Sequence, residues 1–145
     1  MAERPVIELR RAPSLQRAVA WAIDGLPFAL AGLVAAAWLG SEPSLLFPAL
    51  GALSLAAFTY QLLCTWLLGA TFGKRSRRLA VVGPDGARPG LGRSAGRAAA
   101  SVAGVLLLGI GPLVALFTRT GRGLDDLVAG TAVVEAPGPA RPAEA

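Results

Sequence analysis

The stretch QRAVAWAIDGLPFALAGLVAAAWL, residues 16–39, contains about twenty apolar residues and a single acid, Asp24. An α-helix of this length, rising about 1.5 Å per residue, can cross the hydrocarbon core of a bilayer. A carboxylate at the centre of such a helix costs roughly 2.5–3.5 kcal/mol on insertion scales, and intramembrane acids usually face protein groups. The stretch therefore predicts a membrane-spanning helix whose acid finds partners elsewhere in the chain.

The composition of the 145-residue chain also indicates a membrane protein. Apolar residues make up 54% and charged residues 16%, whereas a soluble domain has about 45–50% and roughly 25%. There is no histidine and one cysteine, Cys64, which excludes a Ser-His-Asp triad, a Cys/His zinc site and an intrachain disulfide. We therefore expect no enzymatic activity, no cofactor and no metal. The net charge of +5 is better explained by membrane topology than by nucleic-acid binding.

Two further apolar runs, residues 45–68 and 98–117, follow the first run at residues 18–39. We predict an all-α membrane protein with two or three transmembrane helices built from these runs. Residues 1–17 would form a basic cytoplasmic N-terminus and residues 18–134 the membrane domain. The Pro/Ala-rich residues 135–145 would form a disordered tail.

The basic residues lie on one side of the predicted helices. The connection GSEPS, residues 40–44, has one acid and no base, whereas residues 71–97 carry seven bases and the N-terminal segment carries four arginines. Short basic flanks stay in the cytoplasm, so we predict a bacterial inner-membrane protein with a cytoplasmic N-terminus. Its lipid partner would be anionic headgroups, each facing base contributing about 1 kcal/mol. The bases expected to face them are Lys74, Arg75, Arg77 and Arg78.

The third apolar run has two interpretations. Its middle contains GIGP, residues 109–112, where proline and glycine weaken a helix, and Arg119 and Arg122 follow it directly. Hydropathy favours a third span kinked at the proline. The arginines favour a broken, re-entrant hairpin that enters and leaves on the cytoplasmic side.

Two short stretches rich in β-branched residues favour the hairpin. LAVV at residues 79–82, followed by a turn at residues 84–86, and TAVVE at residues 131–135 both have strand character. An isolated strand of this length is unstable, so each needs a partner. They can form a short β-hairpin-like pair only on the same side of the membrane; otherwise they are two unrelated loop segments.

Several polar residues lie at a depth similar to that of Asp24. Arg17 is seven residues earlier and therefore on the same helical stripe, and Arg97 opens the third run. The second run carries polar side chains in its last turns, namely Tyr60, Gln61 and Thr65. We predict an inner-leaflet polar cluster that locks helices together, with an ion or proton site as the alternative.

The acid pair Asp125–Asp126 also has two interpretations. Adjacent acids do not share a face of a helix, so chemistry by paired carboxylates is not expected. Either acid can cap a short helix that ends at Gly130. Alternatively, Asp126 pairs with Arg97 or Arg93, which requires a cytoplasmic C-terminal region.

Three stretches, in this order, resemble the RDD family of small bacterial membrane proteins: RAVAWAID, GATFGKRSRRLAVVGPDGARP and GRGLDDLVAGTAVV. The resemblance covers nearly all of residues 16–134. It implies that Arg17, Asp24 and Asp126 are the arginine and the two aspartates that give the family its name. It also implies a multi-pass membrane protein, for which transport of unidentified ligands has been suggested.

Two positions depart from the family pattern. Asp125 stands where members often have histidine, so any role of that histidine is absent from this chain. Phe72 stands where proline is common.

Two functions are consistent with these features. The first is a non-enzymatic helix-packing module that assembles with itself or with a membrane partner protein. Small residues in the apolar runs permit close helix contact, namely Gly32, Ala35, Ala36, Gly51, Ala52, Ala56 and Gly104. The alternative is an oligomeric transporter or an ion or proton pathway that uses Asp24.

Overall fold

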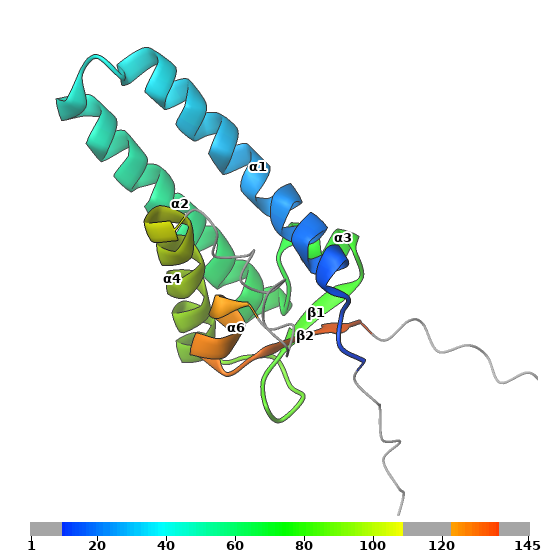
Figure 1. The fold of residues 1–145 in the computed structure, drawn as a ribbon. Coiled ribbons are helices and arrows are strands. Elements are labelled where there is room, and N and C mark those ends of the chain that lie inside the picture. Colours follow the sequence, from blue (N-terminus) through cyan, green and yellow to red (C-terminus); the bar gives the residue numbers. More distant parts are fainter. Residues whose placement is uncertain (1–9, 109–122, 137–145) are drawn as a thin grey trace, which may run out of the picture.

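Two long antiparallel helices are the largest elements of the structure, a computed structural model that describes residues 10–108 and 123–136. Helix α1 spans Ser14–Leu39 and helix α2 spans Pro43–Leu68. A short turn joins them, so they form an extended hairpin (Figure 1). Both are long and apolar enough to cross a membrane, which agrees with the first two predicted runs.

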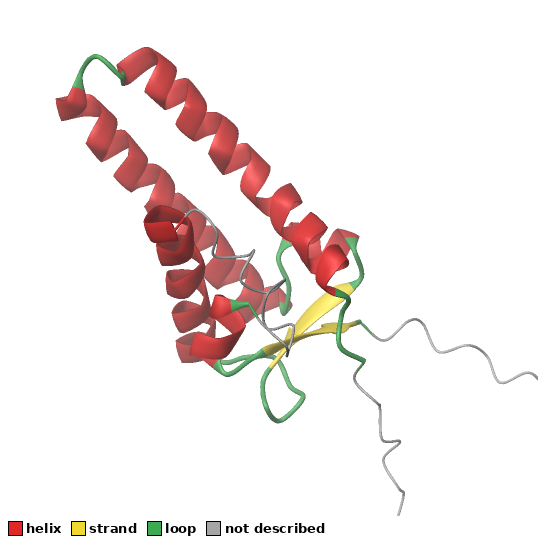
Figure 2. Cartoon of the chain, viewed as in Figure 1, coloured by secondary structure: helices red, strands yellow, loops and turns green. Residues whose placement is uncertain are grey.

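The remaining elements gather at the end of the hairpin where α1 begins and α2 ends (Figures 1 and 2). We call this end the sheet end, and the opposite end the turn end. Along the chain the elements are α3 Phe72–Ser76, β1 Leu79–Val82, α4 Leu91–Leu108, α6 Leu124–Ala129 and β2 Ala132–Glu135. Helix α4 packs along α2, α3 packs against α1, and α6 packs against α4.

Helix α2 ends at Gly69, whose left-handed backbone has a φ of 70°. Glycine adopts this conformation without steric cost, and the Gly69 N–H donates to the Thr65 carbonyl at 3.0 Å. The Arg88 guanidinium donates to the Leu67 carbonyl at 2.7 Å. These two bonds satisfy carbonyls that the end of a helix leaves without partners.

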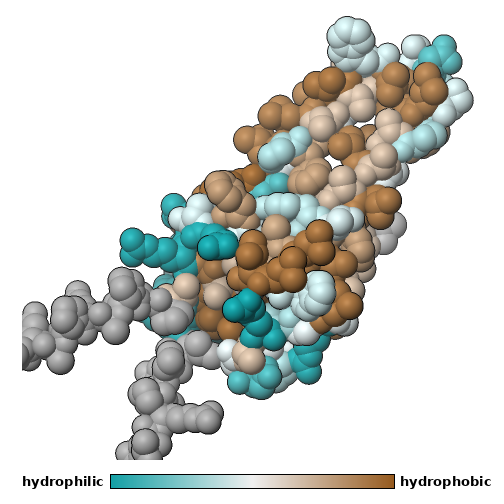
Figure 3. Space-filling view, turned by 180° about the vertical axis from the view of Figure 1, so that it is seen from behind, coloured by the Kyte–Doolittle hydropathy of each residue, from teal (hydrophilic) through white to brown (hydrophobic). Residues whose placement is uncertain are grey.

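The surface of the hairpin away from the sheet end is strongly apolar. Leu33, Trp38 and Phe47 are 67%, 83% and 71% exposed, and hydrophobic side chains cover most of the visible hairpin (Figure 3). Soluble monomers rarely expose a continuous apolar surface of this extent. A surface of this kind is suited to lipid or to other membrane helices.

A small antiparallel sheet closes the sheet end. Strand β1 pairs with β2 in a register that joins Leu79 to Glu135 and Val82 to Ala132. The segment before α1 adds to the other edge of β2, because Arg11 bridges to Val134. Buried apolar residues from the sheet, from α1 and from the segment before α1 pack together beneath it, namely Ala12, Ala20, Leu79, Val81 and Val133.

The predicted pairing of the two β-branched stretches is therefore confirmed, with the first strand at residues 79–82 as expected. The pair is antiparallel, as in a hairpin, although α4 and α6 lie between β1 and β2 in the chain. Two four-residue strands become stable here because residues 11–12 and the cluster beneath them cover the sheet.

The sheet brings both flanks of the third apolar run to the same end of the hairpin (Figure 1). Helix α4 begins at Leu91, before the predicted start of that run at residue 98, and its described part ends at Leu108. The GIGP stretch lies outside the described residues, as do residues 1–9 and the predicted tail at residues 137–145.

Candidate functional site

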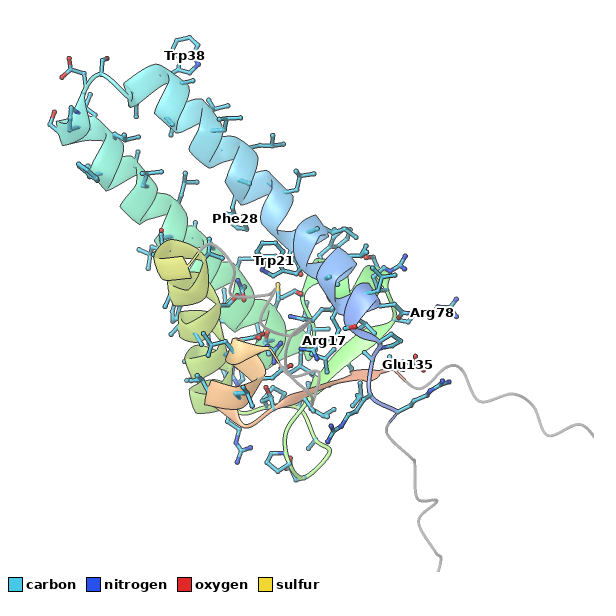
Figure 4. The ribbon with its side chains drawn as sticks, viewed as in Figure 1. Arg17, Trp21, Phe28, Trp38, Arg78 and Glu135 are labelled. Carbon is cyan, nitrogen blue, oxygen red and sulfur yellow. The ribbon has the colours of Figure 1, made fainter. Side chains whose placement is uncertain are left out.

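Two groups of polar side chains lie at the sheet end of the hairpin. We call Asp24 and its hydrogen-bond donors Tyr60, Thr71 and Gly73 the Asp24 cluster. We call the second group the Asp126 cluster, made of Arg17, Arg97, Asp125, Asp126 and Thr131. Figure 4 shows Arg17 at the sheet end of α1 and Trp38 at the turn end.

The Asp24 carboxylate accepts hydrogen bonds from three neutral donors. The Tyr60 hydroxyl donates to Oδ1 at 2.7 Å, and the Gly73 backbone N–H donates to the same oxygen at 2.8 Å. The Thr71 hydroxyl donates to Oδ2 at 2.5 Å. Because the donors belong to α2, to α3 and to their connection, one carboxylate on α1 ties three segments together.

Asp24 and Tyr60 also satisfy the beginning of α3. The first N–H groups of a helix lack partners within the helix. Here the Phe72 N–H donates to the Tyr60 hydroxyl oxygen at 3.0 Å, and the Gly73 N–H donates to Asp24. The positive end of the α3 backbone therefore faces a carboxylate, which is the favourable arrangement.

Gly73 permits the close approach of α3 to α1. A Cβ atom at this position would lie 2.1 Å from the Ala20 carbonyl oxygen and 2.9 Å from the Asp24 Cγ. The first contact is with backbone, so a side chain at residue 73 would force α3 away from α1. Only glycine allows this N–H to reach the Asp24 carboxylate.

Of the predicted partners on α2, Tyr60 reaches Asp24, and its ring also packs against Phe28 with centroids 5.8 Å apart. Gln61 is half-buried, Thr65 is buried, and no hydrogen bond joins either side chain to Asp24. Successive residues of a helix point about 100° apart, so Tyr60 and Gln61 cannot both face α1.

Two arginines hold Asp126, which is fully buried. Arg17 from α1 binds Asp126 Oδ2 at 2.5 Å, and Arg97 from α4 binds Asp126 Oδ1. Arg97 also binds Asp125 at 2.6 Å and donates to the Thr131 hydroxyl at 2.8 Å. The Asp126 cluster therefore joins α1, α4 and α6.

Neither acid of the pair caps α6, because the N-cap residue is Gly123 and it has no side-chain cap bond. The capping interpretation is wrong, whereas the pairing of Asp126 with Arg97 is present. The other predicted candidate, Arg93, donates to the Gly130 carbonyl at 3.4 Å, after the end of α6. Arg97 was also predicted to lie in the polar cluster around Asp24. It pairs instead with the aspartates of α6, and the side chains that donate to Asp24 are Tyr60 and Thr71.

Charge outweighs burial in setting the pKa values of Asp125 and Arg97. Burial acts to raise the pKa of Asp125, but the charges of Arg97, Lys74 and Arg17 outweigh it and lower this pKa. Burial acts to lower the pKa of Arg97, and the neighbouring Asp125 and Asp126 reverse this and raise it. The mutual attraction of Asp125 and Arg97 therefore favours the ionised form of both groups.

Lys74 differs from the basic residues beside it. Its side chain is half-buried, whereas Arg75, Arg77 and Arg78 are exposed, so the four predicted headgroup-facing bases do not form one surface. Burial and the charge of Arg97 lower the pKa of Lys74 to about 8, against the opposing effect of the acids in both clusters. Within the described residues, no hydrogen bond or ion pair holds its ammonium group.

Basic and acidic side chains both lie around Lys74. The bases Arg17 and Arg97 lie in the same region as the acids Asp24, Asp125 and Asp126. Among the described residues, no three His, Cys, Asp or Glu side chains group closely enough to hold a metal ion. The arrangement can hold helices together and can exchange a proton at Lys74.

Sequence reasoning missed Thr71, Gly73 and Thr131 as members of the clusters. Thr71 and Gly73 lie in a connection where depth along a helix cannot be counted, and Gly73 acts through its backbone. The available signal was the stretch GATFGK, which was part of the family resemblance.

Comparison with protein families matches residues 11–130 to the RDD family. The matched range contains all of both clusters except Thr131. No curated protein and no solved structure matches the chain.

Proposed function

The chain belongs to the RDD family, and from that premise we propose that it is a non-enzymatic, multi-pass protein of the bacterial cell membrane that serves as a helix-packing and assembly module. The observation that carries this proposal is that Asp24 and Asp126 each bind groups from several different elements. Asp24 takes three donors from outside α1, and Asp126 takes two arginines from α1 and α4.

Links of this kind are one of the main means by which membrane helices associate. The hydrophobic effect does not drive helices together in lipid, so close packing and hydrogen bonds between helices contribute much of their association. Both clusters join α1 to elements that are distant in sequence. The largest separation is between Arg17 and Asp126, which are 109 residues apart. We infer that their role is to fix one arrangement of the segments around α1.

We further propose that the sheet end faces the cytoplasm, so that the described segments on both sides of the third apolar run lie on that side. Arg75, Arg77 and Arg78 are exposed at the sheet end, whereas the acid at the turn end is Glu42. Basic flanks favour the cytoplasmic side. The pairing of β1 with β2 supports a return of the chain to the side on which it entered.

A C-terminal reporter tests this topology. We expect a reporter that is active only outside the cytoplasm to be silent when fused after residue 145, and a cytoplasmic reporter to be active. The same outside-active reporter fused within residues 40–44 is the positive control. Activity of the outside-active reporter at the C-terminus would refute the return of the chain.

Assembly is supported by the open space beside small residues. A Cβ atom at Gly25, Gly32 or Gly51 would meet nothing within 4 Å. The packing of α1 against α2 therefore leaves space beside these glycines. Small residues with free space permit another helix to approach closely. The occupant that we propose is a helix of a second copy or of a membrane partner.

Cross-linking of the chain in native membranes tests assembly. We expect a discrete oligomer, and we expect Gly32→Leu to reduce it because the side chain fills the open space. Ala37→Leu, which changes an exposed small residue on the same helix, is the matched control. A chain that remains monomeric before any substitution would exclude self-assembly.

Asp24→Asn tests the role of Asp24 directly. Under the assembly proposal the variant still inserts into the membrane but loses stability and oligomer, because an amide cannot accept all three donors. Ion flux in proteoliposomes, measured for both proteins, separates this outcome from transport. A wild-type flux that the substitution abolishes at unchanged oligomer level would favour transport instead.

One observation favours that second function, an oligomeric ion or proton pathway. Lys74 lies close enough to Asp24, Asp125 and Asp126 for each of the three acids to affect its pKa, and its value of about 8 permits proton exchange near neutral pH. Under this function, Lys74→Arg removes pH-dependent flux because arginine stays protonated. Flux that is unchanged in this variant would exclude Lys74 from the pathway.

A further inference from the structure

We propose that the exposed face of α3 and the arginines that follow it bind anionic phospholipid of the inner leaflet. The face consists of Phe72, Arg75, Arg77 and Arg78, and we call it the α3 face. The proposal rests on the cytoplasmic placement of the sheet end, which the reporter fusions test separately.

The five residues of α3 divide between two environments. Gly73 contacts Ala20 and Asp24 on α1, and Lys74 is half-buried beside the two acid clusters. Phe72 is 70% exposed, and Arg75 is exposed. The inner side of α3 is therefore occupied by the protein, and its outer side is open to whatever surrounds α1.

The α3 face runs along α1 from a deeper to a shallower level. Its start is fixed by the contact of Gly73 with Asp24, which lies ten residues into α1, or about 15 Å along its axis. Its end leads into β1, and β2 pairs both with β1 and with Arg11, which precedes α1. The aromatic ring of Phe72 therefore belongs to the deep end, and the arginines to the shallow end.

This order matches the layers of a leaflet. Aromatic side chains favour the boundary between acyl chains and headgroups, and guanidinium groups bind phosphate through paired hydrogen bonds. Each base near an anionic surface contributes about 1 kcal/mol, which is about a fivefold change in affinity. A zwitterionic lipid lacks the net negative charge that three arginines require.

The backbone holds the arginines in a fixed arrangement. Arg78 has a φ of 55°, which non-glycine residues rarely adopt. Its N–H donates to the Arg75 carbonyl at 3.0 Å, and its carbonyl accepts from the Ala136 N–H at 2.7 Å. These bonds fix Arg78 at the outer edge of the sheet end (Figure 4). The acid closest to Arg78 in the sheet register is Glu135, which is half-buried and pairs with Leu79, the residue after Arg78.

Native mass spectrometry of the full chain, purified in neutral detergent, tests the proposal. The probes are phosphatidylglycerol and phosphatidylcholine with identical acyl chains, added in equal amounts. We expect retention of phosphatidylglycerol to exceed that of phosphatidylcholine by roughly tenfold or more. Equal retention of the two lipids would overturn the proposal.

Two variants locate the site. The triple substitution Arg75→Gln, Arg77→Gln and Arg78→Gln is expected to equalise the two lipids, whereas replacement of the same three residues by lysine keeps the preference. Phe72→Ser is expected to lower retention of both lipids several-fold. Phe47→Ser is the matched control, because Phe47 is equally exposed, at 71%, but lies at the turn end. A preference that survives the triple glutamine variant would place the lipid elsewhere and overturn the proposal.

Competition distinguishes a lipid from other phosphate ligands. We expect glycerol phosphate and a short RNA to leave bound phosphatidylglycerol in place, because neither supplies an acyl chain for Phe72. Displacement by glycerol phosphate would show that the face binds free phosphate esters. Displacement by RNA at low concentration would show a nucleic-acid surface, and either result would refute the lipid assignment.

Discussion

The Asp24 cluster and the Asp126 cluster lie at the same end of one helix hairpin, yet they stabilise their carboxylates by different means. Asp24 is surrounded by two hydroxyls and a backbone N–H, all neutral. Asp126 is held by two arginine side chains and a threonine. Asp24 lies on a helix suited to cross a membrane, whereas Asp126 lies on a short helix beside the sheet.

The difference follows from what each location permits. An arginine placed near the middle of a membrane helix is itself costly, so an acid there is best satisfied by groups that are already part of the fold. Beside the sheet, arginines from α1 and α4 can reach the acid with their guanidinium groups. Removing one carboxylate should therefore have unequal effects in the two clusters.

The largest expected effect is that of Asp126→Asn. The substitution leaves Arg97, which is 2% exposed, without one of its two anionic partners, and breaking a buried ion pair from one side costs about 3–5 kcal/mol. Unfolding in mixed detergent micelles measures the loss. Glu42→Gln, at an exposed acid of the turn end, is the control, and a loss below about 1 kcal/mol would mean that Asp125 alone can hold Arg97.

A smaller effect is expected from Gly73→Ala. The new methyl group would lie 2.1 Å from the Ala20 carbonyl oxygen, so α3 must move and the Gly73 N–H loses Asp24. Overpacking of this kind costs about 1–3 kcal/mol. In the same unfolding assay, Gly51→Ala should be neutral or stabilising, because that position is open and helical. Equal stability of the two variants would contradict the close approach.

The sequence was sufficient to predict several parts of this comparison. The lengths of the first two apolar runs predicted α1 and α2, and the β-branched pairs predicted the strands. Counting depth along α2 selected Tyr60, together with neighbours that do not reach Asp24. These successes share a cause, since each depends on periodicity or length within one segment.

The partners of Arg17 illustrate why the rest was not predicted. Its spacing from Asp24 placed both residues on one stripe of α1, but the ion pair that the structure shows for Arg17 is with Asp126, distant in the chain. That contact depends on how α4, α6 and the sheet fold back toward α1. The family resemblance grouped the same residues without saying which of them touch.

Tyr60→Phe measures how much a single neutral donor to Asp24 contributes to the free energy of unfolding. The substitution removes the hydroxyl that donates to Asp24 and accepts from the Phe72 N–H, while the ring packing with Phe28 remains. A typical hydrogen bond contributes about 1 kcal/mol, so we expect a loss of about 1–2 kcal/mol. Thr59→Val is the control, because the Thr59 hydroxyl is exposed and donates only within its own helix. A loss as large as that of Asp126→Asn would remove the distinction between the clusters.

The smallest effect concerns the pH dependence that Lys74 should confer. Its pKa is lowered in the folded protein from 10.5 to about 8, so between these values the unfolded chain binds the extra proton. Stability must then rise as the folded lysine begins to lose its proton, by about 0.8 kcal/mol between pH 7 and 8.5. The charged groups that act on Lys74 are Asp24 on α1, Arg97 on α4, and Asp125 and Asp126 on α6.

Lys74→Met should abolish this rise, because methionine fills a similar volume without titrating. The chain has no histidine, which leaves few other groups to titrate between pH 7 and 8.5. Unfolding of both proteins at the two pH values measures the difference, and the wild-type protein alone should become more stable at the higher pH. A rise that persists in Lys74→Met would assign the titration to another group. No rise in either protein would mean that the acids of the two clusters, rather than burial, control the ammonium, because a folded-state pKa at or above 10.5 leaves stability unchanged in this range.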